Sequence, residues 1–565
     1  MAVEPMRADA DVLIIGSGAA GMYAAIEAAH AGCSVLLVDR SLIGRGGATV
    51  MAQMTVAVAL GSETPDHWSH HYEDTLKAGR GLCNPELAQL FCENAPDCIR
   101  SLDEWGVGWA RKDGRITQAM APGHDRARCV YVDFLNTGPA VSRTMRAVVN
   151  KIGAIRRAGD LCVVDLLRKD GTVVGAVAVH LDTGAPVILR GKATVVATGG
   201  LTRLYRRNSG SANMGGDGYA LALRAGARLV DLEFVQFFPI GHLAPRLIGM
   251  DPIMWDPFRY KLGGRLINNL GEEFTQRYGV AEDGKYVITR DLGSYAILKE
   301  VEAGRGSPHG GAYLSFRHCS EEALRAAFGP VIDRLAANGI DLRQTDVEVA
   351  PIAHYHMGGV VADARMRTDV PGLFAAGEAV GGANGANRLS GNAMSEAFVF
   401  GKQAGHSAAE YAKHARMADG ADNLAASLEL ISAEAPAAAF NTAAMLSHLQ
   451  DVMQDKVGPL RDGNKLTSAL AELDQLTAEL GSHPPGKCDR FAMPRLDWFD
   501  LRNMLLVARV VAGAALARRE TRGAQQREDY PRLSPEGAFN QFVAFKDGAP
   551  AITTAPVRAR AAEPA

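Results

Sequence analysis

The 565-residue sequence lacks the cysteine patterns that bind zinc or iron–sulfur clusters. None of its eight cysteines belongs to a Cys-x-x-Cys pair or stands at zinc-ligand spacing from a histidine. Cys92 and Cys98 are the closest pair, and we expect both in one helix, facing different sides. We therefore predict a reduced, cytoplasmic protein without a bound metal.

Excess charge and long apolar runs are also missing. The net charge of -3 gives no reason to expect nucleic acid or an anionic membrane as a partner. The most apolar helical run, MLLVARVVAGAALA, is short and contains Arg509, so no membrane span is expected. The first residues, MAVEPMRADAD, have neither the basic start nor the apolar run of a signal peptide. These absences favour a globular protein of ordinary composition.

The sequence begins with a strand–helix–strand pattern. DVLIIG is typical of a buried strand, AAGMYAAIEAAHAG of a helix, and SVLLVD of a second strand. Two further strand patterns, KATVVATGG and VPGLFAAGEA, lie downstream and also end in glycines. We predict an α/β fold built around a Rossmann-like domain.

Changes in composition divide the rest of the chain. Residues 235–353 are richer in proline, tryptophan and irregular turns, and after about residue 415 helical periodicity dominates, as in LTSALAELDQLTAEL. We predict a nucleotide-binding domain from 1–235 and 354–415, with an α+β domain inserted at 236–353. A helical domain at 416–545 and a disordered tail at 546–565 complete the expected order.

The motif GSGAAG predicts a dinucleotide site at the first turn. Gly16 permits the tight turn, Gly18 lets the backbone approach a pyrophosphate, and Gly21 allows close helix packing. Asp39, at the end of the second strand, can accept hydrogen bonds from an adenosine ribose. NAD and FAD both fit this unit, but the glycines of ATGG and GLFAAGEA favour FAD, because a flavin needs further strand ends to hold it.

At this point the sequence resembles the flavoprotein subunits of succinate dehydrogenase and fumarate reductase, together with L-aspartate oxidase. The resemblance covers nearly the whole chain. It rests on GSGAAG, ATGG, GDG, RAGA, EFVQF, TRD, HYHMGG, GLFAAGEA, GANRLSGN and ETRGAQQRED, in the family's order. It implies an FAD-dependent oxidoreductase in which the inserted segment is a capping domain that helps to form the active site.

The resemblance also implies roles for individual residues. Arg290 in TRD corresponds to the proton-transferring arginine, His354 in HYHMGG to a substrate-binding histidine, and Arg388 in GANRL to the arginine that holds a substrate carboxylate. Together with the glycine motif, it predicts this cofactor-binding set: Gly16, Ser17, Gly18, Ala19, Ala20, Gly21, Asp39, Arg40, Gly46, Gly47, Ala48, Thr49, Gln53, Thr198, Gly199, Asp217, Glu378, Asn392, Ala393 and Met394.

Two departures from the family pattern change the expected chemistry. Ala48 stands where respiratory members have the histidine that bonds covalently to the flavin, so we predict a non-covalent FAD. The family's EFVQ-aromatic-HPTG reads EFVQFFPIG, which puts Phe238 and Ile240 in place of a histidine and a threonine. With Trp255 and Phe258, these residues predict an apolar substrate pocket.

An apolar pocket disfavours a dicarboxylate, because a buried carboxylate without a partner costs several kcal/mol. We expect hydride transfer at a C–C bond next to a carboxylate or carbonyl, with succinate or fumarate not the best substrate. Arg265 or Lys261 could instead supply the missing charge. An L-aspartate-oxidase-like amino-acid oxidase, favoured by Ala48 and Glu396, is one alternative. A flavoprotein that passes electrons to a partner subunit is another, and self-association into a homo-oligomer stays open.

Overall fold

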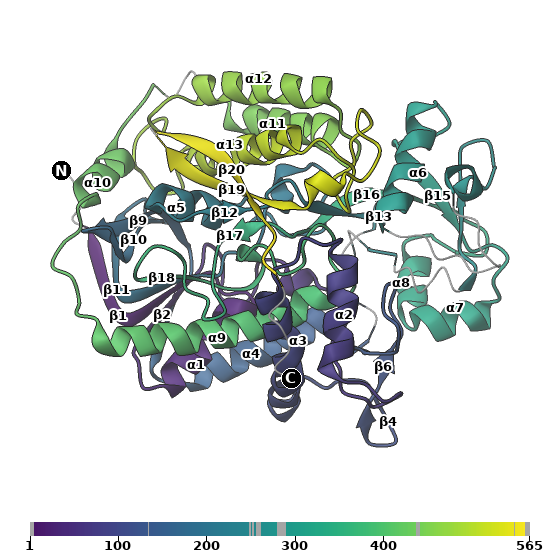
Figure 1. The fold of residues 1–565 in the computed structure, drawn as a ribbon, viewed down its shortest axis with the longest axis horizontal. Coiled ribbons are helices and arrows are strands. Elements are labelled where there is room, and N and C mark those ends of the chain that lie inside the picture. The colour runs from purple at the N-terminus through teal and green to yellow at the C-terminus, as the bar shows by residue number, and fades with distance from the viewer. Residues whose placement is uncertain are drawn as a thin grey trace.

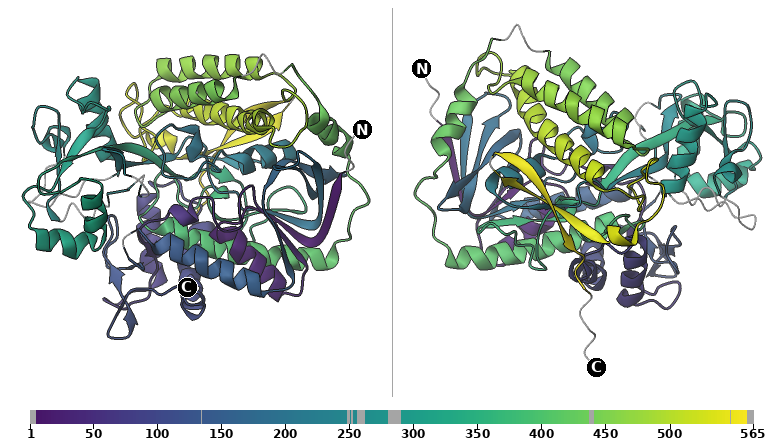
Figure 2. Two further views of the ribbon diagram at one scale, coloured as in Figure 1. Left: turned by 180° about the vertical axis from the view of Figure 1, so that it is seen from behind. Right: turned by 45° about the horizontal axis from the view of Figure 1, so that its top comes forward.

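The computed structural model describes residues 5–133, 135–247, 250, 253–255, 262–279, 290–436, 441–546 and 548–559. A central sheet has helices on both of its faces, and a smaller sheet-and-helix domain projects to one side (Figure 1). The C-terminal helices lie over the sheet on the side opposite to α1, α4 and α9, as the two further views also show (Figure 2).

The central sheet contains the expected strand–helix–strand unit. Its strands have the order β8-β2-β1-β11-β10-β9, and β18 pairs with β11. β1, β2, β8, β11 and β18 run parallel, whereas β9 and β10 form an antiparallel extension. The bounds are β1 Met6–Ile15, β2 Val35–Val38, β8 Ile155–Ala158, β9 Leu161–Lys169, β10 Thr172–His180, β11 Pro186–Val196 and β18 Leu373–Ala375.

Helices cover both faces of this sheet because its parallel strands are apolar on both sides. All four residues of β2, for example, are buried. One face is covered by α1 and α9, which pack against each other, and by α4 (Figure 1). The helices of this part are α1 Ala19–His30, α2 Trp68–Ala78, α3 Pro85–Glu104, α4 Thr137–Lys151, α5 Asp217–Ala225 and α9 Asn392–His414. As predicted, α3 contains both Cys92 and Cys98.

The inserted domain leaves the central part along one strand and returns along the neighbouring one. β13 pairs antiparallel with β16, and the sheet order is β13-β16-β15-β14. Buried apolar side chains between Phe238 and Ile352 give this domain a core of its own. Its elements are β13 Val235–Ala244, β14 Arg265–Ile267, β15 Ala312–Ser315, β16 Val347–His356, α6 Arg290–Glu302, α7 Glu321–Phe328 and α8 Val331–Ala337.

The C-terminal part is helical, with a terminal hairpin. Its helices are α10 Leu424–Ser432, α11 Thr442–Lys456, α12 Gly463–Leu480 and α13 Met493–Ala517. β19 (Phe539–Lys546) pairs with β20 (Ala549–Pro556) and with β12 (Leu229–Val230), which also pairs with β17 (Gly359–Val360). The predicted disordered tail is therefore wrong for residues 549–556, because their backbone groups complete a sheet ladder that composition does not reveal. Residues 547 and 560–565 lie outside the described part.

A buried arginine ties this C-terminal part to the start of β13. The Arg518 side chain is fully buried, its Nε lies 2.6 Å from Glu233 Oε1, and its Nη1 lies 3.0 Å from Glu520 Oε1. Two carboxylates are needed here because an unpaired buried guanidinium is costly. The pairing fixes Glu233 and, with it, the first residues of β13.

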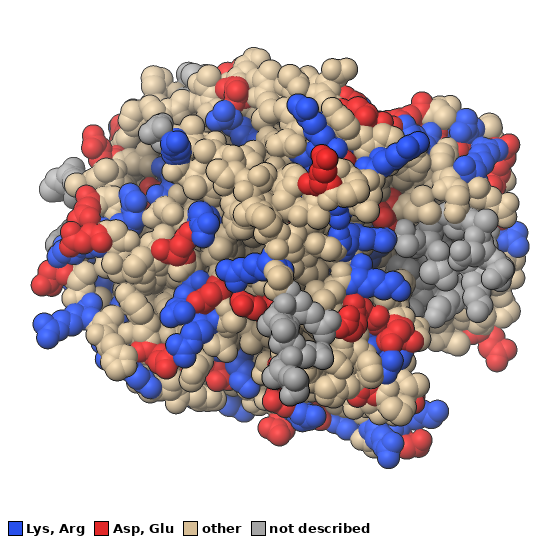
Figure 3. Space-filling view, in the orientation of Figure 1, with Lys and Arg blue, Asp and Glu red and all other residues tan. Residues whose placement is uncertain are grey.

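The nucleotide-binding part also contains short strand pairs close to the site described below. β3 (Val56–Ala57) and β6 (Gln118–Ala119) both pair with β7 (Cys129–Val130), and β4 (Arg111–Lys112) pairs with β5 (Arg115–Ile116). On the face shown in Figure 3, basic and acidic side chains are interspersed. Within the described residues, none of the helices has the length and apolarity needed to span a bilayer.

Candidate active site

A cavity lies where the central sheet meets the inserted domain. The carboxyl ends of β1, β2 and β11 reach it through Ile15, Val38 and Ala197. From the inserted domain, Phe238, Met254 and Arg290 complete its wall. Ligands of open α/β sheets bind at this edge, outside the carboxyl ends of the strands.

The predicted cofactor residues gather on this cavity with two exceptions. All of them line it except Gly21 and Asn392. A Cβ at Gly21 would lie 1.9 Å from the carbonyl oxygen of Gly16, so this glycine serves helix packing rather than ligand contact. Asn392 is buried in α9, where its side chain bonds to His71 and Thr75 instead of facing the cavity.

The glycine turn leaves the positive end of α1 open to the cavity. Gly16 has a φ of 101°, and a Cβ there would lie 2.4 Å from the carbonyl oxygen of Ala197. Gly18, the N-cap residue, has no side chain to cap the helix, although the Thr49 hydroxyl accepts a hydrogen bond from the Ala19 N–H at 2.9 Å. A helix N-terminus exposed in this way stabilises a bound phosphate.

Asp39 stabilises the same turn. Its Oδ2 accepts hydrogen bonds from the Ser17 backbone N–H at 2.7 Å and from the Ser17 hydroxyl at 2.6 Å. Its Oδ1 accepts one from the Ser41 backbone N–H at 2.8 Å. The Ser41 hydroxyl donates a further hydrogen bond to Oδ1 at 2.9 Å, so the two serines fill all four lone-pair positions of the carboxylate. A ribose hydroxyl at the cavity wall would therefore replace one of the two serine hydroxyls as a donor.

The three predicted catalytic residues come from separate elements and line the same end of the cavity. Arg290 is the first residue of α6, His354 lies on β16, and Arg388 lies in the loop before α9. The hydroxyl of Ser209 lies 2.8 Å from His354 Nδ1 and orients the imidazole ring. Arg388 lies over the Tyr355 ring, 4.5 Å from its centroid, and its Nε is buried without a partner among the described residues.

Gln236 bridges the two arginines, a role that the sequence motifs did not reveal. Its Oε1 accepts a 2.7 Å hydrogen bond from Arg290 Nη1. Its Nε2 donates to the Arg388 backbone carbonyl at 2.9 Å and to Asn387 Oδ1 at 2.8 Å. Strand alternation could have indicated it, because Gln236 lies two residues before Phe238 and so on the same face of β13.

Of the three predicted substrate-pocket residues that the structure describes, only Phe238 is on the cavity wall. Its ring centroid lies 5.8 Å from that of His354 and 5.4 Å from Arg290 Cζ. The prediction is wrong for Ile240, because β13 leaves the cavity as it extends, and for Trp255, whose backbone N–H donates to the Ile240 carbonyl at 3.1 Å. Both side chains pack in the core of the inserted domain. Phe258 lies outside the described residues. Arg265 is exposed and does not line the cavity, and Lys261 lies outside the described residues.

Comparisons with known proteins agree with this arrangement. The FAD binding domain family matches residues 11–394, and the fumarate reductase flavoprotein C-terminal family matches residues 446–565. One subunit of fumarate reductase (CoM/CoB) from Methanothermobacter marburgensis is 34% identical over 94% of this chain and 96% of its own length. L-aspartate oxidase from Streptomyces coelicolor is 34% identical over 92% of this chain and 89% of its own.

Solved structures of flavoproteins from the same group are also similar over nearly the whole chain. A variant of the FrdA chain of quinol fumarate reductase from E. coli has a TM-score of 0.90 at 29% identity, over 99% of this chain and 98% of that chain. The chain belongs to the succinate dehydrogenase/fumarate reductase flavoprotein family. It is an FAD-dependent oxidoreductase of the class that acts on CH–CH or CH–NH2 groups, as predicted.

The cavity of this flavoprotein fits FAD. The open helix end at Gly18 suits the pyrophosphate, and Asp39 suits the ribose. The Thr198 hydroxyl lines the cavity and is buried without a partner among the described residues, so it is available to a polar group of the cofactor. These residues would hold the cofactor with Ala393 and Met394 beside the flavin end of the cavity.

Burial controls the protonation of the flavoprotein's active site. It lowers the pKa of His354 well below the ordinary value, and the nearby charges of Arg290 and Arg388 lower it further, so the imidazole is neutral at pH 7. Burial raises the pKa of Glu378 to about 7 and that of Glu396 to about 8. Glu396 does not line the cavity, which removes the support it gave to an amino-acid oxidase.

We predict that Glu396→Gln flattens the pH dependence of stability. The folded protein holds a proton on Glu396 that the unfolded chain releases above pH 4.5, the ordinary pKa. This contribution is complete below the unfolded pKa and is lost as the pH rises through about 8. Between about pH 6 and 8.5, the unfolding midpoint of the wild type should fall about 2 °C more than that of the variant. Thermal scans at matched ionic strength measure this, and equal slopes would contradict it.

Proposed function

We propose that this flavoprotein transfers a hydride between a non-covalent FAD and a C–C bond adjacent to a carboxylate or carbonyl, in a substrate with an apolar portion. The observation that carries the proposal is the convergence of Arg290, His354 and Arg388 on the cavity wall that also contains the Phe238 ring. The two guanidinium groups and the neutral imidazole can donate charge-assisted and neutral hydrogen bonds to one substrate carboxylate. The aromatic ring can pack against an apolar part of the substrate.

Each side chain has a separate task. Arg388 holds the substrate carboxylate through paired N–H donors, and neutral His354, oriented by Ser209, adds a hydrogen bond. A bound FAD would supply the hydride donor or acceptor for one substrate carbon, at its N5 atom. Arg290 exchanges the proton at the neighbouring carbon, so reduction of a C=C bond adds one hydride and one proton. Through its hydrogen bonds to both, Gln236 fixes the position of the Arg290 side chain relative to the Arg388 backbone.

Non-covalent attachment follows from the residue at the covalent position. Ala48 lines the cavity and carries no nucleophile. A protein–flavin bond of the histidyl type requires an imidazole at that place. The cofactor is therefore held by the backbone and polar contacts described above.

A dicarboxylate fits this wall poorly. Its second carboxylate needs charge-assisted donors, and the position that the family fills with histidine is filled here by an aromatic ring. Phe238 also occupies the space between Arg290 and His354. We propose a monocarboxylate, a ketone or a thioester with an apolar substituent as the substrate class.

Anaerobic reduction of the bound flavin tests this substrate class. The purified protein is mixed with mono- and dicarboxylates and with saturated ketones and thioesters, and bleaching of the flavin absorbance is followed. Bleaching by apolar monocarboxyl or carbonyl compounds, with succinate at least tenfold slower in kcat/KM, is expected. Succinate as the fastest reductant would overturn the proposal.

Phe238→His should improve dicarboxylate binding, since it returns a polar donor to the cavity wall. We expect the Kd for succinate or fumarate to fall about tenfold, which is the effect of one added hydrogen bond to a charged group. Ile240→Thr is the matched control, because Ile240 is buried in the core and does not line the cavity. Titration of the flavin absorbance measures both variants. An equal effect of the two substitutions would exclude Phe238 as the residue that selects the substrate.

A flavin-bearing component of a larger complex is a second candidate. It is favoured by the match of residues 446–565 to the fumarate reductase flavoprotein C-terminal family and by similarity to a protein named as one subunit of a fumarate reductase. In that case, the protein should co-purify from its native host with a cysteine-rich, iron–sulfur partner. Rapid reoxidation of the isolated, reduced protein by oxygen, with one peroxide per flavin, would favour an oxidase instead.

A further inference from the structure

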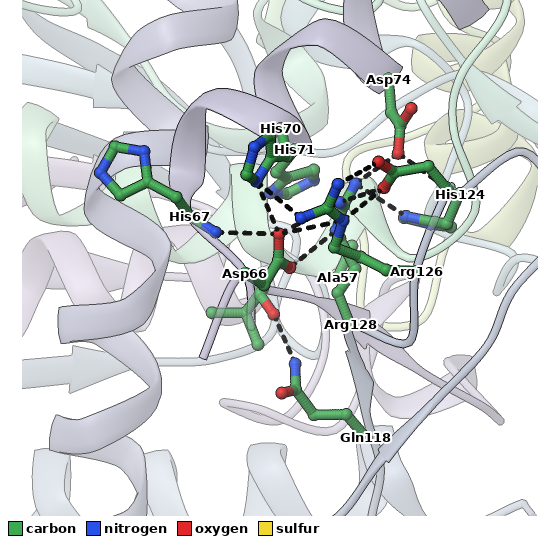
Figure 4. Close-up of polar contacts among 12 residues, drawn as sticks. Ala57, Asp66, His67, His70, His71, Asp74, Gln118, His124, Arg126 and Arg128 are labelled. Atoms are coloured by element: carbon green, nitrogen blue, oxygen red, sulfur yellow. Dashed lines mark hydrogen bonds and ion pairs between the residues drawn. The ribbon is translucent and has the colours of Figure 1, made fainter. Parts of the chain in front are cut away.

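A buried arginine with three carboxylate partners lies behind the Arg388 loop. The Arg128 side chain is fully buried, with Nε 3.0 Å from Asp66 Oδ2, Nη1 2.5 Å from Asp74 Oδ2 and Nη2 2.7 Å from Asp125 Oδ1. In Figure 4, its guanidinium group lies between Asp66 and Asp74. A guanidinium held on three sides has little freedom to move, so it forms a rigid support for its neighbours.

His124 connects this arginine to the active-site loop. Its Nδ1 lies 3.5 Å from Arg128 Nη1, and its Nε2 lies 2.7 Å from the backbone carbonyl oxygen of Ser390. A guanidinium only donates and a carbonyl only accepts, so Nδ1 is the acceptor and Nε2 carries the hydrogen. Burial lowers the pKa of His124 to about 4, which keeps the ring neutral at pH 7. Arg128 and the carbonyl therefore select one tautomer.

The carbonyl that His124 holds lies two residues beyond Arg388. Ser390 and Arg388 both line the cavity. The Arg388 guanidinium contacts this same stretch of backbone, because its Nη1 donates to the carbonyl of Leu389 at 3.3 Å. A shift of the 389–390 peptide would therefore move the guanidinium.

A second histidine supports the end of the loop. His71 is buried, and its Nε2 lies 2.8 Å from Asn392 Oδ1 at the start of α9. Its ring lies 6.2 Å from that of His124. The loop from Arg388 to Asn392 is thus held from its rear by α2 and by the segment before β7, while its other side lines the cavity.

We propose that His124 is a positioning residue for substrate binding, with Arg128 fixing its tautomer. Its Nε2–H holds the Ser390 carbonyl so that the Arg388 guanidinium meets the substrate carboxylate. This inference rests on the proposed function of Arg388. Small errors in the position of a binding group reduce both affinity and turnover, which is why a residue without substrate contact can matter.

The test compares three substitutions at this position. His124→Phe removes the donor, His124→Asn has an amide too short to reach Ser390, and His124→Gln can place an Nε2–H near the position of the original one. We expect the first two to raise KM for the carboxylate substrate and its Kd about tenfold, with a smaller change in kcat. His124→Gln should recover to within about threefold of the wild type. Flavin content and flavin reduction potential should not change.

His70→Gln is the matched control. His70 belongs to the same network, 3.5 Å from Asp66 Oδ1, but lies at its exposed edge beside Arg126. It should keep the wild-type KM and kcat. If His124→Phe fails to fold, His124→Asn decides the outcome. Equal KM values for His124→Asn, His124→Gln and the wild type would overturn the inference, as would an equal rise in KM for His70→Gln.

Arg388→Lys separates this inference from the proposed function. Lysine keeps the charge but loses the paired donors, so carboxylate affinity should fall at least tenfold. Unchanged affinity in this variant means that the proposed role of Arg388 is wrong. A fall in affinity for Arg388→Lys, together with unchanged His124 variants, rejects the positioning role alone.

Discussion

The antiparallel pairing of β13 with β16 is the constraint on which the active site depends. The chain enters the inserted domain along β13 and returns along β16, with Val235 opposite His356 and Gln236 opposite Tyr355. This ladder places Gln236 and Phe238 from one strand beside His354 from the other. The buried pairing of Arg518 with Glu233 fixes the start of β13 from the C-terminal side. Three distant parts of the chain therefore determine one wall of the cavity.

Burial away from water explains the protonation states of the ionisable groups at this wall. His354 is neutral because burial and two neighbouring arginines oppose its protonation. The same burial lowers the pKa of Arg388, although the guanidinium stays charged, and strengthens its attraction to a carboxylate. Glu396 keeps its proton for the same reason, so it does not compete with the substrate for Arg388. This wall therefore suits a substrate group with a single negative charge.

Sequence periodicity and local motifs predicted the nucleotide-binding part well. GSGAAG, the two flanking strands and Asp39 are local features, because all of them belong to one strand–turn–helix–strand unit. Their roles follow from the short-range geometry of that unit. The prediction that Cys92 and Cys98 share a helix was confirmed for the same reason. The substrate pocket was predicted less well, because alternation along β13 does not show where the strand leaves the cavity. Ile240 belongs to the core of the inserted domain for that reason, and Trp255 joins the same core beside it through a backbone hydrogen bond to the Ile240 carbonyl.

Taken alone, the sequence was sufficient to predict the fold class and the dinucleotide-binding turn, because local geometry and side-chain chemistry determine these features. The three charged residues of the cavity wall were named only through the resemblance to the flavoprotein family, and their role toward a substrate stays a prediction. The three-dimensional arrangement was needed to show that Gln236 joins Arg290 to Arg388 and that His124 holds the loop behind Arg388. It was also needed to show that residues 549–556 form a strand. Each of these depends on contacts between residues far apart in the chain. Alternation along β13 could place Gln236 on the same face as Phe238, but no sequence period identifies a hydrogen-bond partner at that distance.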